Sequence, residues 1–310
     1  AAGGTVNLNA GSSLNISNDQ SVGVYALNGT NILNDGTTVL GNNSFGYVLR
    51  SGSALLNNAD VTAGDGSIIV FGDGARSITN NGAVTLGGSS GVAFYTVNGG
   101  NIQNTGDITG TAGTANVGIY NENGIINNTG KIRVGDSVIR DFEDSSKNSY
   151  AIGIYGEDAE VNNSGNIKTG YRGTGIYTEN NKLTNSGNIT SDGEYAVGLW
   201  GSKAVIENNG EIVMNGDYSQ GIMGTSQSNI VNNSIITMNG NNSIGISGNE
   251  GTKIQNNGII NLYGNDSTGI MLSNGSLLLN KGTINLGAGS NNAEVQNGSS
   301  VIPPSIVNAG

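Results

Sequence analysis

Aliphatic side chains recur along the chain two positions before an asparagine, and the step between repeats is nearly constant. The asparagines are separated by 23, 23, 24, 24, 35, 22, 23, 24, 24 and 24 residues. They are Asn34, Asn57, Asn80, Asn104, Asn128, Asn163, Asn185, Asn208, Asn232, Asn256 and Asn280. The aliphatic residues are Ile32, Leu55, Ile78, Ile102, Ile126, Val161, Leu183, Ile206, Ile230, Ile254 and Leu278. A fixed step of this length indicates a solenoid, in which each repeat is one coil and like residues stack on like.

Each coil contains a first strand pattern of a small or apolar residue, glycine, an aliphatic residue and an aromatic residue. Ser21–Tyr25 and Ala151–Tyr155 are examples, and the glycine is replaced in two coils, by Ile69 and Val92. Because side chains alternate along a strand, we expect the aliphatic residue to face the core. The glycine before it and the aromatic residue after it are then expected to face outward. The predicted core row is Val24, Tyr47, Val70, Ala93, Ile119, Ile154, Ile176, Leu199, Ile222, Ile246 and Ile270.

The second strand pattern is aliphatic-x-Asn-x-Gly-x-aliphatic, as in Leu183–Ile189. Its aliphatic ends are expected to face the core, with the asparagine at a turn between them. There its amide can donate to, and accept from, the asparagines of the neighbouring coils. The glycine two residues later is expected to supply a positive φ for the bend.

These patterns predict an all-β fold, a right-handed parallel β-helix of about 11 coils of 22–24 residues with an asparagine ladder. A leucine-rich repeat has a similar length but needs a leucine pattern that the chain lacks. We expect one continuous domain over residues 1–310. Gly4–Leu8 resembles Gly282–Leu286, so the chain opens inside a coil and is interpreted as a piece of a longer protein.

Composition excludes several kinds of site. The chain has 12 basic and 23 acidic residues, a net charge of −11, which disfavours nucleic acid as a partner. It has no cysteine and no histidine, which excludes disulfides and metal sites built on those ligands. No cofactor is expected. No apolar run reaches 18 residues, so membrane insertion by this segment is not expected either.

The short sequences NNSGNI, TNSGNI, NTGKI, NNGEI and NNGII alternate with GIY, GLW and GIM. Over about residues 20–290, this alternation resembles the passenger domains of large type V autotransporter adhesins, most closely those of fusobacteria. The resemblance implies display on the outer membrane at the bacterial cell surface, secretion through a C-terminal barrel, and adhesion to host or bacterial cells. It supplies no motif of binding residues.

The residues that come directly after the core-row residues form a second, largely aromatic row, which is the first candidate for partner binding. We expect its members to face outward and, among small neighbours, to form a shallow track for a partner side chain or a sugar ring. Alternatively, the rings only cover and stiffen the sheet. The expected row is Tyr25, Val48, Phe71, Phe94, Tyr120, Tyr155, Tyr177, Trp200, Met223, Ser247 and Met271.

Two positions further along, Glu122, Glu157 and Glu179 fall in three consecutive coils, about 5 Å apart. Like charges at that spacing repel, so they need a cation or solvent screening. Calcium is one possibility, although no calcium-loop motif is present, and a solvated turn is the other. An acidic, aromatic track favours a host or bacterial surface protein with cationic groups, and a neutral glycan is the second candidate.

The 35-residue step contains an insertion over residues 136–148, which is the most charged stretch of the chain. Loops that leave a rigid solenoid often bind partners, although long loops are also tolerated without a role. Its candidate contact residues are Arg140, Asp141, Phe142, Glu143 and Asp144.

Three functions remain open: an adhesin segment, a structural spacer of an autotransporter, and a polysaccharide-degrading enzyme. Parallel β-helices also serve as lyases and glycosidases, which use clustered carboxylates or arginine. The candidate acids are Asp141, Glu143, Asp144, Asp158 and Glu160. Their separations do not follow from the sequence, and we therefore predict an adhesin segment with no catalytic residues.

Overall fold

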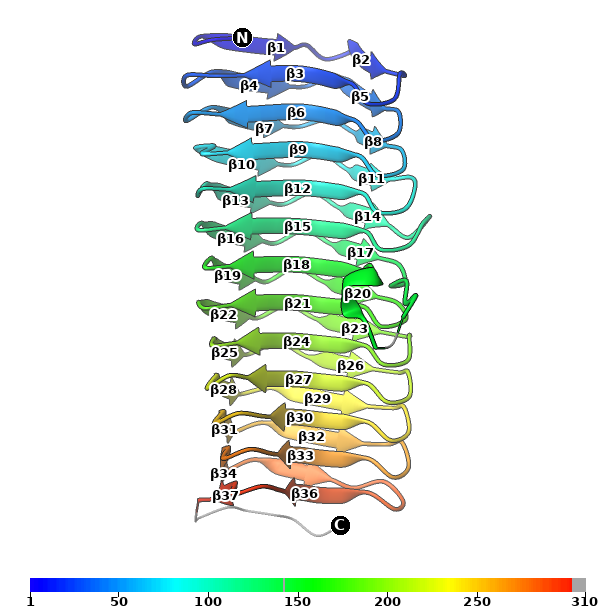
Figure 1. The fold of residues 1–310 in the computed structure, drawn as a ribbon, viewed down its shortest axis with the longest axis vertical. Helices are drawn as coiled ribbons and strands as arrows, with labels where there is room; N and C mark the ends of the chain where they lie inside the picture. The colour runs from blue at the N-terminus through cyan, green and yellow to red at the C-terminus, as the bar shows by residue number, and fades with distance from the viewer. Residues whose placement is uncertain (142, 303–310) are drawn as a thin grey trace. The chain divides into compact units, whose positions relative to one another are not determined.

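The computed structural model describes residues 1–141 and 143–302, and its contacts divide the chain into two compact units, Ala1–Glu160 and Val161–Gly310. Within each unit the chain winds through three parallel sheets, so the protein is a parallel β-solenoid of about 12 turns (Figure 1). The predicted all-β solenoid is confirmed. That residues 1–310 behave as one domain remains a prediction.

Unit 1 has six strands in each of its three sheets, and within the unit each strand pairs with the strand three positions later in the chain. The first sheet contains β1 (Thr5–Leu8), β4 (Asn31–Asn34), β7 (Ala54–Asn57), β10 (Ser77–Asn80), β13 (Asn101–Asn104) and β16 (Ile125–Asn128). The second sheet contains β2 (Ser13–Ile16), β5 (Thr37–Leu40), β8 (Val61–Ala63), β11 (Val84–Leu86), β14 (Ile108–Gly110) and β17 (Ile132–Val134). The third sheet contains β3 (Val22–Ala26), β6 (Phe45–Arg50), β9 (Ile68–Asp73), β12 (Val92–Val97), β15 (Val117–Glu122) and β18 (Ile152–Glu157).

Unit 2 repeats this arrangement. Its first sheet contains β19 (Glu160–Asn163), β22 (Lys182–Asn185), β25 (Val205–Asn208), β28 (Asn229–Asn232), β31 (Lys253–Asn256), β34 (Leu277–Asn280) and β37 (Ser300–Val301). Its second sheet contains β20 (Ile167–Thr169), β23 (Ile189–Ser191), β26 (Ile212–Met214), β29 (Ile235–Met238), β32 (Ile259–Leu262) and β35 (Thr283–Asn285). Its third sheet contains β21 (Thr174–Glu179), β24 (Val197–Ser202), β27 (Gln220–Thr225), β30 (Ile244–Gly248), β33 (Thr268–Leu272) and β36 (Asn291–Val295).

The core of each unit is built from stacked aliphatic rows. Ile206, Ile212 and Ile222, one from each sheet of a single coil, are fully buried. Each such side chain contributes roughly 1.5–3 kcal/mol on burial. One coil replaces an aliphatic residue with Tyr47, whose hydroxyl lies 2.7 Å from the Thr38 hydroxyl. Burial raises the pKa of Tyr47 to about 12, although the hydrogen bond to Thr38 acts in the opposite direction.

The predicted third-sheet register was wrong by one residue in one coil. Phe94, not Ala93, pairs with Val70 and Ile119, and Phe94 is buried in the core row. Ala93 therefore occupies the glycine position, and Tyr95 takes the outward place that the sequence assigned to Phe94. A slip of one residue exchanges the two faces of a strand, so a single misplaced residue changes both rows.

The third-sheet glycines do not face outward, which corrects a second expectation. Gly198 is buried, and a Cβ there would lie 2.5 Å from the carbonyl oxygen of Gly221 in the next coil. The same close approach recurs at Gly221, whose Cβ would lie 2.5 Å from the oxygen of Gly245. These glycines therefore allow neighbouring coils to approach closely and do not border the aromatic row as exposed small residues.

The asparagine ladder is confirmed within both units. Asn185 donates from Nδ2 to Oδ1 of Asn208 at 2.9 Å, and its own Oδ1 accepts from Asn163 at 2.8 Å. The same Nδ2 also donates to the carbonyl oxygen of Gly187 at 3.0 Å. Each amide therefore links two coils and also holds its own turn, which satisfies buried polar groups that would otherwise be costly.

The glycine two residues after each ladder asparagine does not have a positive φ, contrary to the sequence prediction. A Cβ at Gly106 would lie 2.0 Å from the carbonyl oxygen of Gly82 in the preceding coil. Close packing of the turns therefore explains these glycines. Ala59 and Ser234 occupy the same position in two coils, so it also admits a small side chain.

Positive φ angles occur instead at the turns on either side of the third sheet. Asn242 (φ 52°) precedes β30, and Asn274 (φ 51°) follows β33. Asparagine, aspartate and glycine tolerate this left-handed conformation best. Unit 2 places two tyrosines there, Tyr195 and Tyr218.

Candidate partner-binding surface

The outer face of the third sheet carries a row of mostly aromatic and apolar side chains, most of them half-buried, although Tyr25 is exposed and Val48 is buried. In unit 1 the strand register aligns Tyr25, Val48, Phe71, Tyr95, Tyr120 and Tyr155. In unit 2 it aligns Tyr177, Trp200, Met223, Ser247 and Met271. The row forms because each strand presents its residue after the core aliphatic to the outside.

Ring contacts fix the unit 1 part of this row. The Phe71 and Tyr95 rings are stacked at 5.8 Å between centroids, and those of Tyr95 and Tyr120 at 4.4 Å, both with an interplanar angle of 11°. Tyr155 meets Tyr120 edge to face at 4.9 Å and 86°. A stacked row of rings presents a large contact area that is already ordered before a partner binds.

A carboxylate lies against the rings at the end of β18. Tyr120 donates its hydroxyl proton to Oε2 of Glu157 at 2.7 Å. Burial and this hydrogen bond raise the pKa of Tyr120 well above its ordinary value, so the phenol remains a donor at neutral pH. Glu122 aligns with Glu157 in the strand register, as the sequence predicted, and accepts a hydrogen bond from Asn123 at 3.1 Å.

Unit 2 contains a second tyrosine–glutamate pair. Tyr177 donates to Oε2 of Glu179 on the same strand at 3.2 Å. Its ring lies 4.8 Å from that of Trp200, tilted by 50°. The indole nitrogen of Trp200 is buried without a hydrogen-bond partner among residues 1–141 and 143–302, an arrangement that costs about 1–3 kcal/mol.

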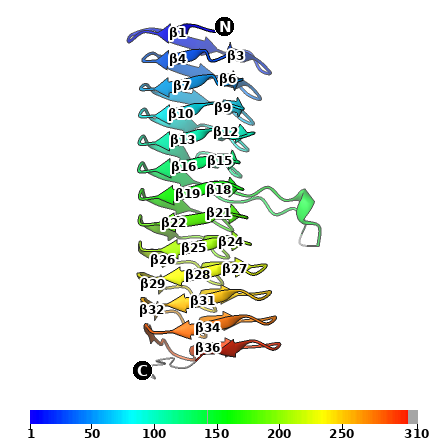
Figure 2. The ribbon, with the colours of Figure 1, turned by 90° about the vertical axis from the view of Figure 1, so that its left-hand side faces the viewer.

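The predicted insertion projects from unit 1 between β17 and β18 (Figure 2). An antiparallel bridge between Val138 and Ser149 closes its base, and its one short helix is η1 (Ser145–Lys147). The loop enters β18 at Ile152, whereas Glu157 ends that strand. Its base therefore lies one strand length from the glutamates, as predicted.

Internal hydrogen bonds order the described part of the insertion. Oδ1 of Asn148 accepts from the backbone N–H groups of Arg140 at 2.8 Å and Asp141 at 3.1 Å. Lys147 contacts the carboxylates of Asp141 at 2.8 Å and Asp144 at 3.4 Å. Hydrogen bonding by Lys147 lowers the pKa of Asp141, and hydrogen bonding by Ser146 lowers that of Asp144.

The remaining residues of the insertion differ in their exposure to solvent. Arg140 and Glu143 are exposed. Phe142 lies outside the described residues. Val138 and Ile139 are half-buried at the base of the loop.

The candidate acids do not resemble a catalytic pair. A general acid needs a raised pKa, whereas those of Asp141 and Asp144 are lowered. Asp158 lies in the turn after β18, and Glu160 begins β19. Within residues 1–141 and 143–302, no group of three acidic side chains could hold a metal ion.

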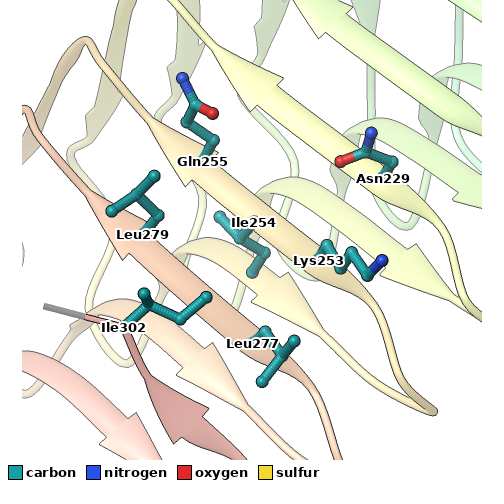
Figure 3. A pocket seen from close by; sticks show the side chains of 7 residues that line it. All are labelled: Asn229, Lys253, Ile254, Gln255, Leu277, Leu279 and Ile302. Carbon is teal, nitrogen blue, oxygen red and sulfur yellow. The ribbon is translucent and has the colours of Figure 1, made fainter.

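A shallow hollow of about 170 Å³ lies on the first sheet of unit 2. Leu277 and Leu279 of β34 line it together with Ile302 and with Lys253 and Gln255 of β31 (Figure 3). None of the candidate partner-binding residues predicted from the sequence lines it. Its apolar lining and single charged group give it no catalytic chemistry.

Three further tyrosines lie at the turns between the second and third sheets of unit 2, and sequence reasoning did not select them. Tyr171, Tyr195 and Tyr218 are spaced by 24 and 23 residues, which is the coil period itself. That spacing was the signal that could have identified them.

A family model described as the BigA third pectate lyase-like domain matches residues 1–201. The chain belongs to this family. BigA is an autotransporter-like adhesin, and a β-solenoid matched to one of its domains fits the passenger segment that the sequence predicted. No curated protein matches the chain.

In BigA, a domain with a pectate lyase-like fold is part of an adhesin. The fold alone therefore does not imply lyase chemistry in a BigA-type domain. Its adhesin context suggests an adhesin-like passenger exposed at the surface. In the described part of the chain, no helix is long and apolar enough to cross a membrane.

Proposed function

We propose that this segment is an adhesive part of a passenger displayed on the bacterial cell surface, which binds host or bacterial surface proteins through the outer face of its third sheet. The observation that supports this most strongly is the Tyr95–Tyr120–Tyr155 ring stack of unit 1, with Glu122 and Glu157 at its border. The match to a BigA-type domain supports the same conclusion.

The geometry of the ring stack suits protein recognition. Binding normally orders flexible side chains at a cost of about 0.5–1.5 kcal/mol each, and rings that are already stacked avoid much of that cost. Aromatic residues also dominate the energetics of protein interfaces. Tyr120, Tyr155 and Glu157 therefore combine a rigid apolar contact with a fixed negative charge.

The charge of this surface favours a partner that carries arginine or lysine. Glu122 and Glu157 lie beside tyrosine rings, and a cation can pair with the carboxylates while it lies over a ring. Tyr177, Glu179 and Trp200 provide the same combination in unit 2. A neutral glycan would use the rings but not the carboxylates, so it is the second candidate for this surface.

Binding of the purified protein to cultured epithelial cells tests the proposal with three variants. Tyr155→Ala removes a ring, and Glu157→Gln removes the charge but keeps an acceptor for the Tyr120 hydroxyl. Each should weaken binding about tenfold, since interface residues of this kind contribute about 1–2 kcal/mol. Leu56→Ala, which removes an exposed apolar side chain from the first sheet of unit 1, is the matched control and should bind like the wild type.

Turnover distinguishes adhesion from the enzymatic alternative. Incubation with polygalacturonate should release no unsaturated oligosaccharide, whereas a lyase would release it steadily. A structural spacer would neither bind cells nor cleave the polymer. Equal binding by the wild type and by folded Tyr155→Ala and Glu157→Gln variants would discard the proposed surface.

A further inference from the structure

The turns that lead into the third sheet of unit 2 hold bulky residues in a backbone conformation that disfavours them. Arg172, Tyr195 and Tyr218 have φ values of 50°, 58° and 57°, whereas the next two coils place Asn242 and Asp266 there at 52°. A left-handed conformation is unusual for a large side chain and is tolerated by asparagine and aspartate.

Turn formation does not require the tyrosines. The backbone N–H of Tyr218 donates to the carbonyl oxygen of Asn241 at 2.9 Å, and that of Asn242 donates to Asn265 at the same distance. Asparagine therefore makes the same turn with less strain. Strain that the fold does not need is a reason to look for a function of the side chain.

The two tyrosine rings form an ordered stack that faces solvent. Their centroids lie 5.0 Å apart with an interplanar angle of 8°, and Tyr195 and Tyr218 are 39% and 48% exposed. The guanidinium of Arg172 lies 4.5 Å from the centroid of Tyr195, at the end of the stack opposite Tyr218. The next coil along the stack has Asn242, an exposed residue with a short amide side chain, at the turn position that Tyr218 occupies.

We propose that Tyr218 and Asn242 bind a pyranose ring of a neutral oligosaccharide. The apolar face of a sugar ring can stack on the open face of Tyr218, while the amide of Asn242 donates to and accepts from its hydroxyl groups. Tyr263, which is 68% exposed, directly follows β32 and precedes the turn of Asp266. It lies about 10 Å from the Tyr218 coil along the stacking direction, at about 4.8 Å for each of two coils, so a second sugar can reach it.

The charges around the stack select a neutral ligand. Glu194 and Asp217 directly precede the two tyrosines, and Asp266 occupies the same turn position two coils beyond Tyr218; these carboxylates disfavour an anionic polymer. A cation from a partner would compete with Arg172, which already lies over Tyr195. A ligand that offers a flat ring and hydroxyl groups without charge fits both restrictions.

Isothermal titration with chitotetraose and cellotetraose tests the site, and Tyr218→Asn is the decisive variant. It installs the residue that the next coil already uses, so its melting temperature should equal or exceed that of the wild type. Its affinity for the tetrasaccharide should fall by about tenfold, because one stacking face is lost. Leu56→Ala, which removes an exposed apolar side chain from the first sheet of unit 1, should bind the sugar like the wild type.

Three results would overturn the proposal. These are no binding of either tetrasaccharide by the wild type at millimolar concentration, equal affinity of Tyr218→Asn and the wild type, and preferential binding of polygalacturonate. A loss of stability in Tyr218→Asn would also contradict it, because the tyrosine would then be structural. Glu157→Gln should leave sugar binding unchanged, so failure here is distinguishable from failure of the protein-binding surface.

Discussion

At the scale of single residues, each asparagine of the ladder stabilises the contacts between neighbouring coils as well as its own turn. Asn185 is fully buried, and its amide makes three hydrogen bonds, two to neighbouring coils and one to its own turn. A hydrophobic residue of similar size would fill the space but leave the amides of Asn163 and Asn208 incompletely paired. Since an unpaired buried group is costly, the ladder works only as a continuous series.

Asn185→Leu should therefore lower the free energy of unfolding by about 1–3 kcal/mol. Asn209→Leu is the matched control, because Asn209 directly follows the next ladder residue, Asn208, but is exposed, and its replacement should change stability by less than about 0.5 kcal/mol. Urea unfolding followed by circular dichroism measures both. An equal effect of the two substitutions would show that burial of the ladder contributes nothing.

At the scale of strands and turns, the sequence predicted what repeats along the chain but not what depends on contacts between coils. The aliphatic rows and the ladder repeat with the coil period, so periodicity alone identified them. The coil of Phe94 was misread because Ala93 stands in for glycine and two aromatic residues follow it. Only pairing with Val70 and Ile119 shows which of the two is inside.

The glycines were misread for a related reason. A local rule assigns glycine to positive φ, yet Gly106 and Gly198 are glycines because a neighbouring coil's carbonyl oxygen lies close to the place of a Cβ. That distance arises from stacking and has no local signature. The spacing of Tyr195 and Tyr218 could have identified these tyrosines, but their strain could not be predicted, since a backbone angle cannot be read from residue type.

The insertion should contribute to partner binding more than to stability. Replacing residues 139–148 with a short Gly-Ser turn keeps the Val138–Ser149 bridge, and keeps Ser137, whose hydroxyl accepts from the Ala151 N–H at 2.9 Å. Loop length changes stability by only about 0.6 kcal/mol for each doubling, so the melting temperature should hardly move. Binding to cells should weaken.

Two outcomes would contradict this expectation. Unfolding of the shortened protein would mean that the loop packs on the solenoid as a structural element, with the half-buried Ile139 as one of its contacts. Unchanged stability with unchanged binding would mean that the loop has no part in recognition. The partner surface would then be limited to the outer face of the third sheet.

At the scale of the whole molecule, net charge and the stacking of coils together determine which ligands the two proposed surfaces can bind. The net charge of −11 repels anionic surfaces, and the solenoid presents its few aromatic residues in rows that no single coil could form. The two proposed surfaces differ in how they use these properties. The third-sheet surface joins rings to carboxylates, whereas the Tyr195–Tyr218 stack joins rings to an amide.

This difference predicts that salt weakens binding at the third-sheet surface but not at the Tyr195–Tyr218 stack. Raising sodium chloride from 0.1 M to 1 M shortens the screening length from about 10 Å to about 3 Å. Binding to cells through Glu122 and Glu157 should weaken by about tenfold, as expected when an electrostatic contribution of about 1.4 kcal/mol is screened. Binding of chitotetraose at Tyr218 involves no ion pair, and its dissociation constant should stay the same across the series.

Cell binding that does not change with salt would remove the electrostatic part of the proposed function and leave the rings as its only basis. Sugar binding that falls with salt would show that Glu194 or Asp217 takes a charged group, which contradicts a neutral ligand.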